Sequence, residues 1–378
     1  EIGNVEWDNG RIRAANTGDT LTTGSGSLSD LVIAADGTPR RIGGGVVSDF
    51  DMAADGSELR IAEMTLEGTE DHVYDVEIAD LSVANAKSRS RGQMFDRVDV
   101  GSFSASGLAL GPLDAFAEKA KQEGVDGEFA IDRKVDGEVS LRDMKVFSGD
   151  REIGHLGELD AVYGPEGDSG YAVDLTFADN GARFPEQSTR MSGFHNILFA
   201  QLRDMGYDSL SSSGRYAVYF DEANGVFEIR NFNIQVDDMA AFEMSAAFSG
   251  MPKVDRDAVE DRPQALMKEA SQVRLDSFRV RFDDDSIVNR LIEKGAEQRG
   301  MSVDQYRQQS VQQVRQMAQM QGMPQVGEKL ATFFQNPQSL EIVADPQTPL
   351  RLQELAQFGM RSPQQVMDRT GLEITVNQ

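Results

Sequence analysis

Short runs of alternating apolar and polar residues fill the N-terminal third of the chain. They are separated by turn-forming breaks such as Asp36-Gly37 and Gly43-Gly44-Gly45. Alternation with a period of two is typical of half-buried β-strands, and Asp-Gly and glycine clusters are typical of turns. The clearest strands are predicted over residues 28–34, 73–83 and 95–110.

A six-residue pattern recurs: apolar, any residue, small polar or acidic, apolar, any residue, apolar. Its copies begin at Ile61, Ile78, Val100, Leu141, Ile229 and Leu275. Strand side chains alternate between faces, so apolar residues three positions apart point oppositely unless the strand bulges or bends between them. We therefore expect a bulge or bend at the polar third position, which would curve a sheet. The copies are either a true structural repeat or convergent strand patterning.

The best-defined antiparallel meander is predicted over residues 215–251. Asn224-Gly225 is a favoured two-residue hairpin turn, and Asp237-Asp238 supplies the next turn. The intervening strands keep one apolar face. It is formed by Tyr216, Val218, Phe220, Phe227, Ile229, Phe232, Ile234, Val236, Phe242, Met244, Ala246 and Phe248.

Helical periodicity appears between these strands and dominates after residue 285. Ser302 and Gln305 are predicted to form a capping box, in which each side chain bonds the backbone of the other residue. The predicted start and stop residues of the helices are Pro112 and Gly124, Met191 and Gly206, Ser286 and Gly300, then Ser302, and finally Ser362 with Pro363.

These elements predict a mainly β chain of the α+β class, in which curved antiparallel meander sheets form an elongated groove with covering helices. We expect a β-rich region over residues 1–124 that ends in a short helix, and a central antiparallel meander with one helix over 125–252. A strand, a helical C-terminal region and a final strand are expected over 253–378. None of these boundaries has the composition of a flexible linker, so one elongated molecule and separate domains are both compatible with the sequence.

Charge and composition limit the classes of partner that the protein is expected to bind. The chain carries 63 acidic and 37 basic side chains, a formal net charge of −26. This balance repels nucleic acid and anionic lipid headgroups, so nucleic acid is not an expected partner. No stretch approaches about 18 uninterrupted apolar residues. Because the chain opens at Glu1, we expect a mature chain without a transmembrane segment, from which a signal peptide or N-terminal anchor was removed.

The sequence contains no catalytic or metal-binding motif. It has no cysteine, and His72, His155 and His195 are isolated from one another. We interpret Asp283-Asp284-Asp285 as a favourable partner of the following helix dipole rather than as a cation site. We expect no catalytic residue, no metal and no cofactor. The Gln- and Met-rich helix after Ser302 is either packed on the open end of a sheet or a lid over a lipid or partner surface.

The C-terminal third carries a family resemblance. Its residues are the run Phe282-Asp283-Asp284-Asp285-Ser286-Ile287-Val288-Asn289-Arg290-Leu291, then Gly300-Met301-Ser302, then Phe333-Phe334-Gln335-Asn336-Pro337-Gln338-Ser339-Leu340, with Pro346, Pro349-Leu350 and the closing strand over 372–376. These segments resemble the end of AsmA/YdgA-like bacterial envelope proteins. The resemblance implies a periplasmic protein, often tethered to the inner membrane, whose curved sheets form an apolar groove. Relatives in this broad group are associated with lipid movement or outer-membrane homeostasis. The strong acidity departs from that pattern and argues against a membrane-to-membrane conduit.

Two functions follow as hypotheses. The first is a non-enzymatic envelope protein that binds or conveys a lipid, an acyl chain or another hydrophobic ligand in a β-groove walled by Phe227, Ile229, Phe242, Met244 and Phe248. About ten buried methylenes at about 0.8 kcal/mol each would approach micromolar capture if ordering costs are small. The second is a structural or interaction module with a sealed core, whose helical tail docks an envelope protein. An enzyme would need a carboxylate pair that converges in a cleft.

Overall fold

The computed structural model describes residues 3–13, 19–33, 39–54, 56–70, 73–85, 95–109, 136–184, 193–252, 271–355 and 363–378. Most of these residues lie in β-strands, and the few helices are concentrated in the C-terminal third. The expectation of a mainly β chain is therefore confirmed.

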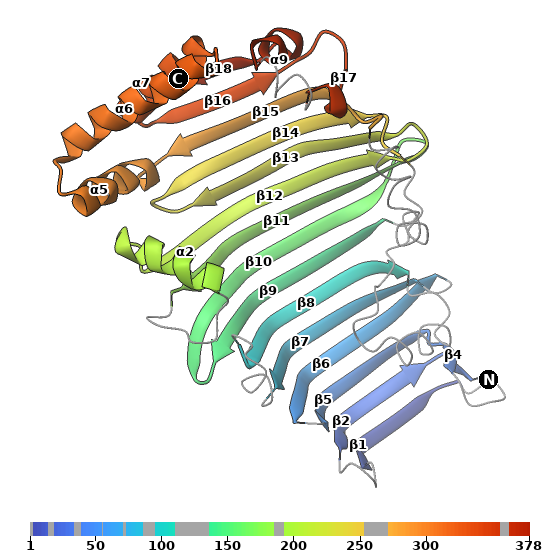
Figure 1. Ribbon diagram of the computed structural model, residues 1–378. Coiled ribbons are helices and arrows are strands. Elements are labelled where there is room, and N and C mark those ends of the chain that lie inside the picture. Colours follow the sequence, from blue (N-terminus) through green and yellow to red (C-terminus); the bar gives the residue numbers. More distant parts are fainter. Residues whose placement is uncertain are drawn as a thin grey trace. The chain divides into compact units, whose positions relative to one another are not determined.

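One long open antiparallel sheet contains nearly all the strands (Figure 1). Its members are β1 (Val5–Arg13), β2 (Thr20–Ser29), β5 (Gly44–Ala54), β6 (Ser57–Glu70), β7 (Val73–Asn85), β8 (Arg97–Ala109), β9 (Gly137–Ser148), β10 (Arg151–Glu166), β11 (Gly170–Arg183), β12 (Ser209–Asp221), β13 (Val226–Val236), β14 (Ala240–Ser249), β15 (Arg274–Asp284), β16 (Ser339–Ala344), β17 (Leu350–Arg351) and β18 (Glu373–Val376). Strands lie beside their neighbours in the sequence, while β3 (Val32–Ile33) and β4 (Pro39–Arg41) pair separately. The sheet is thus built mainly as a meander.

The chain divides into two compact units. Unit 1 comprises Glu1–Pro165 and Leu175–Ala200, and unit 2 comprises Glu166–Asp174 and Gln201–Gln378. The expected limits at 1–124, 125–252 and 253–378 stay predictions.

Two of the three strands predicted in the N-terminal third are confirmed, because 73–83 lies within β7 and 95–110 largely coincides with β8. The prediction of one strand over 28–34 is wrong. β2 ends at Ser29, and Asp30 adopts a left-handed conformation with a φ of 50°. A left-handed residue turns the chain, so β3 begins only at Val32.

The strands of unit 1 share a bend, which we call the crease. Along it, alternate strands carry an Asn or Asp with a φ of 49° to 55°, and the strands between carry Gly or Ala. The crease residues, in sheet order, are Asn9, Gly24, Asp49, Ala62, Asp80, Gly101, Asp143, Gly157 and Asp179. Asn and Asp tolerate the left-handed region better than other residues that have a Cβ.

The crease confirms a bend in the four copies of the six-residue pattern in unit 1, but the bend is at the predicted third position in only two of them. In the copies that start at Ile78 and Leu141 it falls on the polar third residue, Asp80 or Asp143. In the copies at Ile61 and Val100 the bend falls on the second residue instead. Those two strands run antiparallel to their neighbours. A straight row across the sheet therefore passes through the second residue of their pattern and the third residue of the neighbours' pattern.

Small residues face the left-handed aspartates because space there is short. A Cβ placed on Gly101 would lie 3.0 Å from the Cβ of Asp143, and one on Gly157 would lie 2.8 Å from the Cβ of Asp179. The register between β6 and β7 nevertheless does not shift at the crease, because both strands bend in the same row. Apolar residues three apart therefore stay on one face.

Unit 2 keeps its apolar residues on one face differently. Around Arg230 and Asn231, the register of β13 shifts by one residue against both β12 and β14. In β15 the register shifts at Asp276 against β14. Bulges in the copies at Ile229 and Leu275 are thus confirmed, but Arg230 and Asp276 occupy the second position of the pattern rather than the predicted third. Each is one extra residue in a strand whose neighbours continue regularly.

The predicted turns of the meander are also confirmed. Gly225 has a φ of 61° in the turn between β12 and β13, and Asp238 has a φ of 57° between β13 and β14. The first loop has four residues, 222–225, rather than the two of an Asn-Gly turn, and the second has three, 237–239; they make β12, β13 and β14 antiparallel neighbours.

The described helices of eight or more residues are α2 (Gly193–Asp204), α5 (Ile287–Arg299), α6 (Val303–Met320), α7 (Pro324–Gln335) and α9 (Pro363–Thr370). Gly206 and Gly300 end α2 and α5 as predicted, with φ values of 87° and 63°. The capping box of Ser302 and Gln305 is present. The helix predicted from Pro112, the start at Met191 and the cap at Ser362 lie outside the described residues.

Ser286 occupies the predicted cap position of α5, but the capping bond comes from another residue. The Oδ1 of Asp284 accepts a hydrogen bond from the Val288 N–H at 2.9 Å, while the Ser286 hydroxyl donates to the Asp238 carbonyl. The acidic run therefore serves the start of α5, as interpreted from the sequence.

Candidate ligand-binding face

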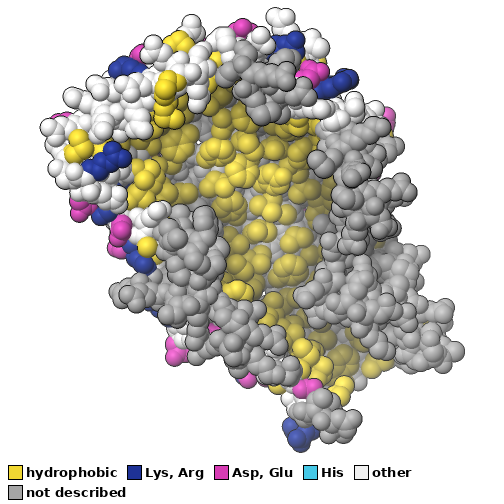
Figure 2. Space-filling view, viewed as in Figure 1, with side chains coloured by type: hydrophobic (Ala, Val, Ile, Leu, Met, Phe, Trp, Pro, Cys, Tyr) yellow, Lys and Arg dark blue, Asp and Glu magenta, His cyan; other side chains and the backbone are white. Residues whose placement is uncertain are grey.

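Strands β12 to β15 present one face of apolar side chains, which we call the apolar face. Residue pairing across the strands arranges it in rows. One row pairs Tyr216 with Phe232, Phe232 with Met244, and Met244 with Val280. Figure 2 shows the result as a continuous band of hydrophobic side chains over the strands of unit 2.

The five residues predicted to wall a groove all lie on this face. Phe227 pairs with Phe248, with ring centroids 6.2 Å apart. Ile234 pairs with Phe242 in the next strand, and the ring of Phe232 meets that of Phe242 at 5.9 Å. The remaining two predicted residues, Ile229 and Met244, occupy equivalent positions in β13 and β14.

The large side chains of the apolar face are only half-buried. Phe227, Phe242, Met244 and Phe248 all keep part of their surface accessible, and Tyr216 is 37% exposed. Small Ala246 on the same face is 5% exposed. Neighbouring strands therefore cover the flanks of the large side chains, while the described residues leave their tips accessible.

The set predicted from the sequence omits an entire strand of this face. Phe278, Val280 and Phe282 of β15 pair with Ala246, Met244 and Phe242 of β14 and extend the rows. Their period-two spacing was visible in the sequence. The sequence did not indicate that β15 pairs with β14, because residues 253–270 separate the two strands in the chain.

Helices border the apolar face on one side. The ring of Phe333 in α7 is 4% exposed and meets the ring of Phe282 at 6.1 Å. Helix α6 packs on α7 through Ala318, whose Cβ would lie 2.6 Å from a Cβ placed on Gly327. The helical region is thereby anchored at the β15 end of the face.

The opposite face of the same strands is laced with ion pairs, and we call it the polar face. Arg230 binds Glu166 through two hydrogen bonds of 2.8 Å and stacks on Tyr219 at 4.4 Å. The hydrogen bonds from Arg230 lower the pKa of the Glu166 carboxyl. Arg279 binds Glu341 at 2.6 Å. A face so rich in paired charge is suited to contact with water.

Arg215 and Asp174 form a further pair on the polar face. The Nε of Arg215 donates to the Oδ1 of Asp174 at 2.8 Å, and a second, parallel bond joins the same groups. These bonds lower the pKa of the Asp174 carboxyl and raise that of the guanidinium. The pairing is bidentate, which fixes the geometry of both side chains.

The histidines do not form a site in the described part of the chain. His155 lies between carboxylates, with 3.3 Å from its Nδ1 to Glu152 Oε1 and from its Nε2 to Asp179 Oδ1. His72 and the side chain of His195 lie outside the described residues. Among the residues that are described, no three His, Cys, Asp or Glu side chains group to hold a metal ion.

Burial raises the pKa of Asp284, and the nearby carboxylate of Asp285 adds to the effect. This is the arrangement that an acid–base site would use, but the Oδ1 of Asp284 already accepts the Val288 N–H. This bond ties Asp284 to the start of α5, while its Oδ2 is buried without a hydrogen-bond partner.

The fold and this face define a class: an open antiparallel β-sheet protein with one apolar face and one ion-paired face. Residues 233–377, less than half of the chain, match a family model described as "Uncharacterized protein". No curated protein matches the chain. None of the described helices has the length and hydrophobicity needed to cross a bilayer.

Proposed function

We propose that the protein is a non-enzymatic binding protein of the bacterial cell envelope, whose apolar face holds the acyl chains of a lipid or a similar hydrophobic ligand. The observation that carries the proposal is the half-buried state of the large side chains in β12 to β15. Large contiguous apolar patches mark binding sites more often than ordinary surface. In this account, the curved strands form the groove expected from the sequence.

The dimensions of the apolar face support an acyl ligand. Neighbouring strands lie about 4.8 Å apart, so a row from β12 to β16 spans about 19 Å. One leaflet of a bilayer's hydrocarbon core is about 15 Å thick, which is the length that an acyl chain fills. The row through Phe232, Met244 and Val280, which Ile342 extends in β16, is therefore long enough for one chain.

Charge favours a ligand without a net negative headgroup. The formal net charge of −26 creates a potential that opposes anions near the surface. A neutral or zwitterionic lipid fits this field better than an anionic one.

The proposal includes membership of the AsmA/YdgA-like group and a periplasmic location. Its support is the resemblance of three C-terminal segments. They cover the end of β15 with the start of α5, the link between α5 and α6, and the end of α7 with the start of β16. These segments position the helices beside the apolar face.

A protein-interaction module is the alternative function, and α6 favours it. Met317 and Met320 of this helix are 50% and 80% exposed. Methionine is enriched and charge depleted in the cores of protein interfaces. In this alternative, a partner protein covers the helix and the apolar face is a closed core.

The test compares two substitutions at adjacent positions of β14. Met244→Gln keeps the side-chain size but puts an amide on the apolar face, whereas Glu243→Gln changes the polar face. The titrated probe is an uncharged pyrene-labelled acylglycerol. We expect saturable binding to the unchanged chain and to Glu243→Gln, and binding about tenfold weaker in Met244→Gln, because an unpaired amide opposes burial against a chain.

Equal affinity in the two variants would contradict the proposed site. Absence of uptake by the unchanged chain would remove the lipid-binding function and leave the interaction module. Circular dichroism of both variants controls for loss of the fold.

A further inference from the structure

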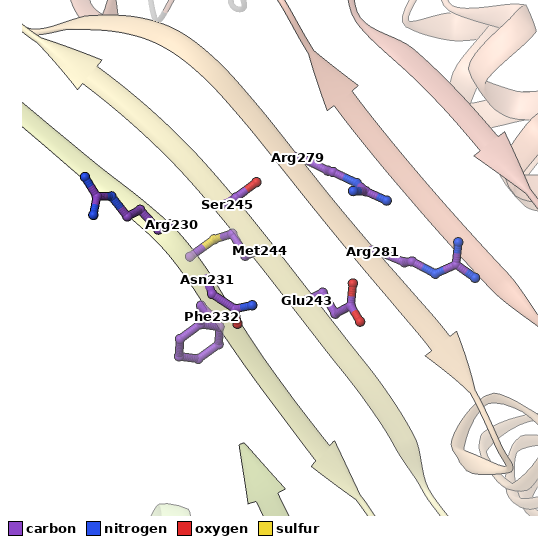
Figure 3. Close-up of a pocket in the computed structure, with 8 residues that line it drawn as sticks. All are labelled: Arg230, Asn231, Phe232, Glu243, Met244, Ser245, Arg279 and Arg281. Atoms are coloured by element: carbon purple, nitrogen blue, oxygen red, sulfur yellow. The ribbon is translucent and has the colours of Figure 1, made fainter. Parts of the chain in front are cut away.

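A second candidate site lies on the polar face of unit 2, on the other side of the sheet from the proposed acyl site. A pocket of about 150 Å³ opens between β13, β14 and β15 (Figure 3). Its polar lining comes from Arg230, Asn231, Glu243, Ser245, Arg279 and Arg281, and Phe232 and Met244 also line it.

The bulge in β13 shapes this pocket. Ile229 and Phe232 both lie on the apolar face, so the two residues between them, Arg230 and Asn231, both face the polar side. They stand opposite one residue of β14, Ser245. Bulges re-aim side chains and are over-represented beside functional sites.

The side-chain oxygen of Asn231, Oδ1, has no hydrogen-bond partner, although it is buried. Most buried polar side-chain atoms in proteins have at least one hydrogen-bond partner, so an orphaned acceptor calls for an explanation. In Figure 3 the amide nitrogen of Asn231 extends toward Glu243, and the amide oxygen points in another direction. A ligand that donates a hydrogen bond would satisfy the Asn231 oxygen.

The charges around the pocket select against an anion. Arg279 is bonded to Glu341, and Arg281 is bonded to Asp283 at 2.7 Å. Both guanidinium charges are therefore neutralised by carboxylates. Glu243 adds a carboxylate, whose Oε1 accepts a hydrogen bond from the Asn233 amide at 3.4 Å. An anion would meet this negative charge with no unpaired cation to offset it.

We propose that this pocket binds a neutral polyhydroxyl group of the size of one sugar ring, with a hydroxyl that donates to the Oδ1 of Asn231. The pocket has room for a few water-sized groups, so it suits a ligand no larger than a single ring. The lining mixes acceptors on Asn231 and Glu243 with donors on Arg279 and Arg281, and hydroxyl groups can bond to both kinds. The hydrogen-bonding groups of this pocket lie on the polar face, whereas Phe232 and Met244, which also line it, belong to the proposed acyl site.

Saturation-transfer NMR and calorimetry on the full chain test the proposal. The probes are glucose, galactose and N-acetylglucosamine, with inorganic phosphate as the anionic comparison. The variant is Asn231→Leu, which keeps the size but removes both amide groups. Its matched control is Gln235→Leu, which lies in the same strand on the same polar face but does not line the pocket.

We expect at least one sugar to bind the unchanged chain and Gln235→Leu equally. Binding to Asn231→Leu should be about tenfold weaker, because the donated hydrogen bond is lost. The same sugar should raise the Tm of the unchanged chain and not that of Asn231→Leu. Phosphate should not bind.

Failure of all three sugars to bind would overturn the proposal, as would equal binding by Asn231→Leu or binding of phosphate alone. If Asn231→Leu does not fold, Ser245→Ala takes its place. That variant removes a hydroxyl from the pocket lining, so weaker sugar binding supports the proposal and unchanged binding contradicts it.

Discussion

Units 1 and 2 keep apolar residues on one face of the sheet by two different backbone structures. Both contain strands in which apolar residues stand three apart and must share one face. In unit 1, the strands of the long sheet step together at the crease, so β6 and β7 keep their register there. In unit 2, β13 and β15 step by an extra residue while β14 between them stays regular. One sequence pattern therefore encodes two backbone structures, and the neighbouring strands decide which one forms.

The difference has a consequence for sites. A crease residue such as Asp80 lies opposite a small residue, Gly101, in the next strand. A bulge instead brings two consecutive side chains to one face, as with Arg230 and Asn231, and the pocket lies at that point. The bulged unit can thus use both of its faces.

The largest effect is expected from removing a bulge. Deletion of Arg230 shifts half of β13 by one residue and turns Phe227 and Ile229 toward the polar face. We expect a loss of about 4 kcal/mol or more in the free energy of unfolding, measured by urea titration with circular dichroism. Arg230→Gln keeps the bulge and should lose about 1 kcal/mol. Equal losses in the two variants would show that the extra residue has no structural role.

Crowding the crease should have the next largest effect. Gly101→Val places a branched side chain against Asp143 and should destabilise unit 1 by about 3 kcal/mol. Ala62→Val is the control, because Ala62 already carries a Cβ at the crease and is exposed. We expect it to lose less than about 1 kcal/mol. Trp7, the single tryptophan, lies in unit 1 and reports the unfolding by fluorescence.

Glycine substitutions should change stability in opposite directions in the two units. Asp80→Gly relieves a left-handed residue with a φ of 49° and should stabilise by about 1 kcal/mol. Asn231 does not have a positive φ, so Asn231→Gly should destabilise by about 1 kcal/mol through backbone entropy. Thermal unfolding measures both. The same sign in both variants would contradict two distinct backbone structures.

The smallest effect concerns pH and the ion pairs of the polar face. Arg230 lowers the folded-state pKa of Glu166 below its ordinary value of 4.5. The pair therefore stabilises the fold above that value, and the contribution is lost as the pH falls through the lowered pKa. Because Glu166 is 46% exposed, we expect less than about 1 kcal/mol. Glu166→Gln should flatten the acid limb of the stability curve, and an unchanged limb would exclude this pair as its source.

Local signals in the sequence predicted much of the fold. The turn at Asn224-Gly225, the capping box at Ser302 and the stop at Gly300 each depend on a few adjacent residues, and all three are present. The apolar face was predictable in the same way, since period-two spacing assigns Phe242 and Met244 to one side of β14. The broken strand over 28–34 was missed because the left-handed conformation of Asp30 has no strong local signature.

What depends on strand partners was not predictable. Whether a step becomes a crease or a bulge depends on the neighbouring strands, which the sequence does not name. Arg230 pairs with Glu166, which is 64 positions away in the sequence. Patterns among adjacent residues therefore could not predict this ion pair. The orphaned oxygen of Asn231 likewise follows from its position in the folded sheet.

The most direct test of the central claim is photo-crosslinking of the full chain with an uncharged acylglycerol that carries a diazirine on its acyl chain, followed by mass spectrometry of the peptides. The account predicts crosslinks on the apolar face of β13, β14 and β15, at residues such as Phe232, Met244 and Val280. They should be competed away by unlabelled lipid. Crosslinks confined to α6, or none that unlabelled lipid reduces, would contradict an acyl site on the apolar face.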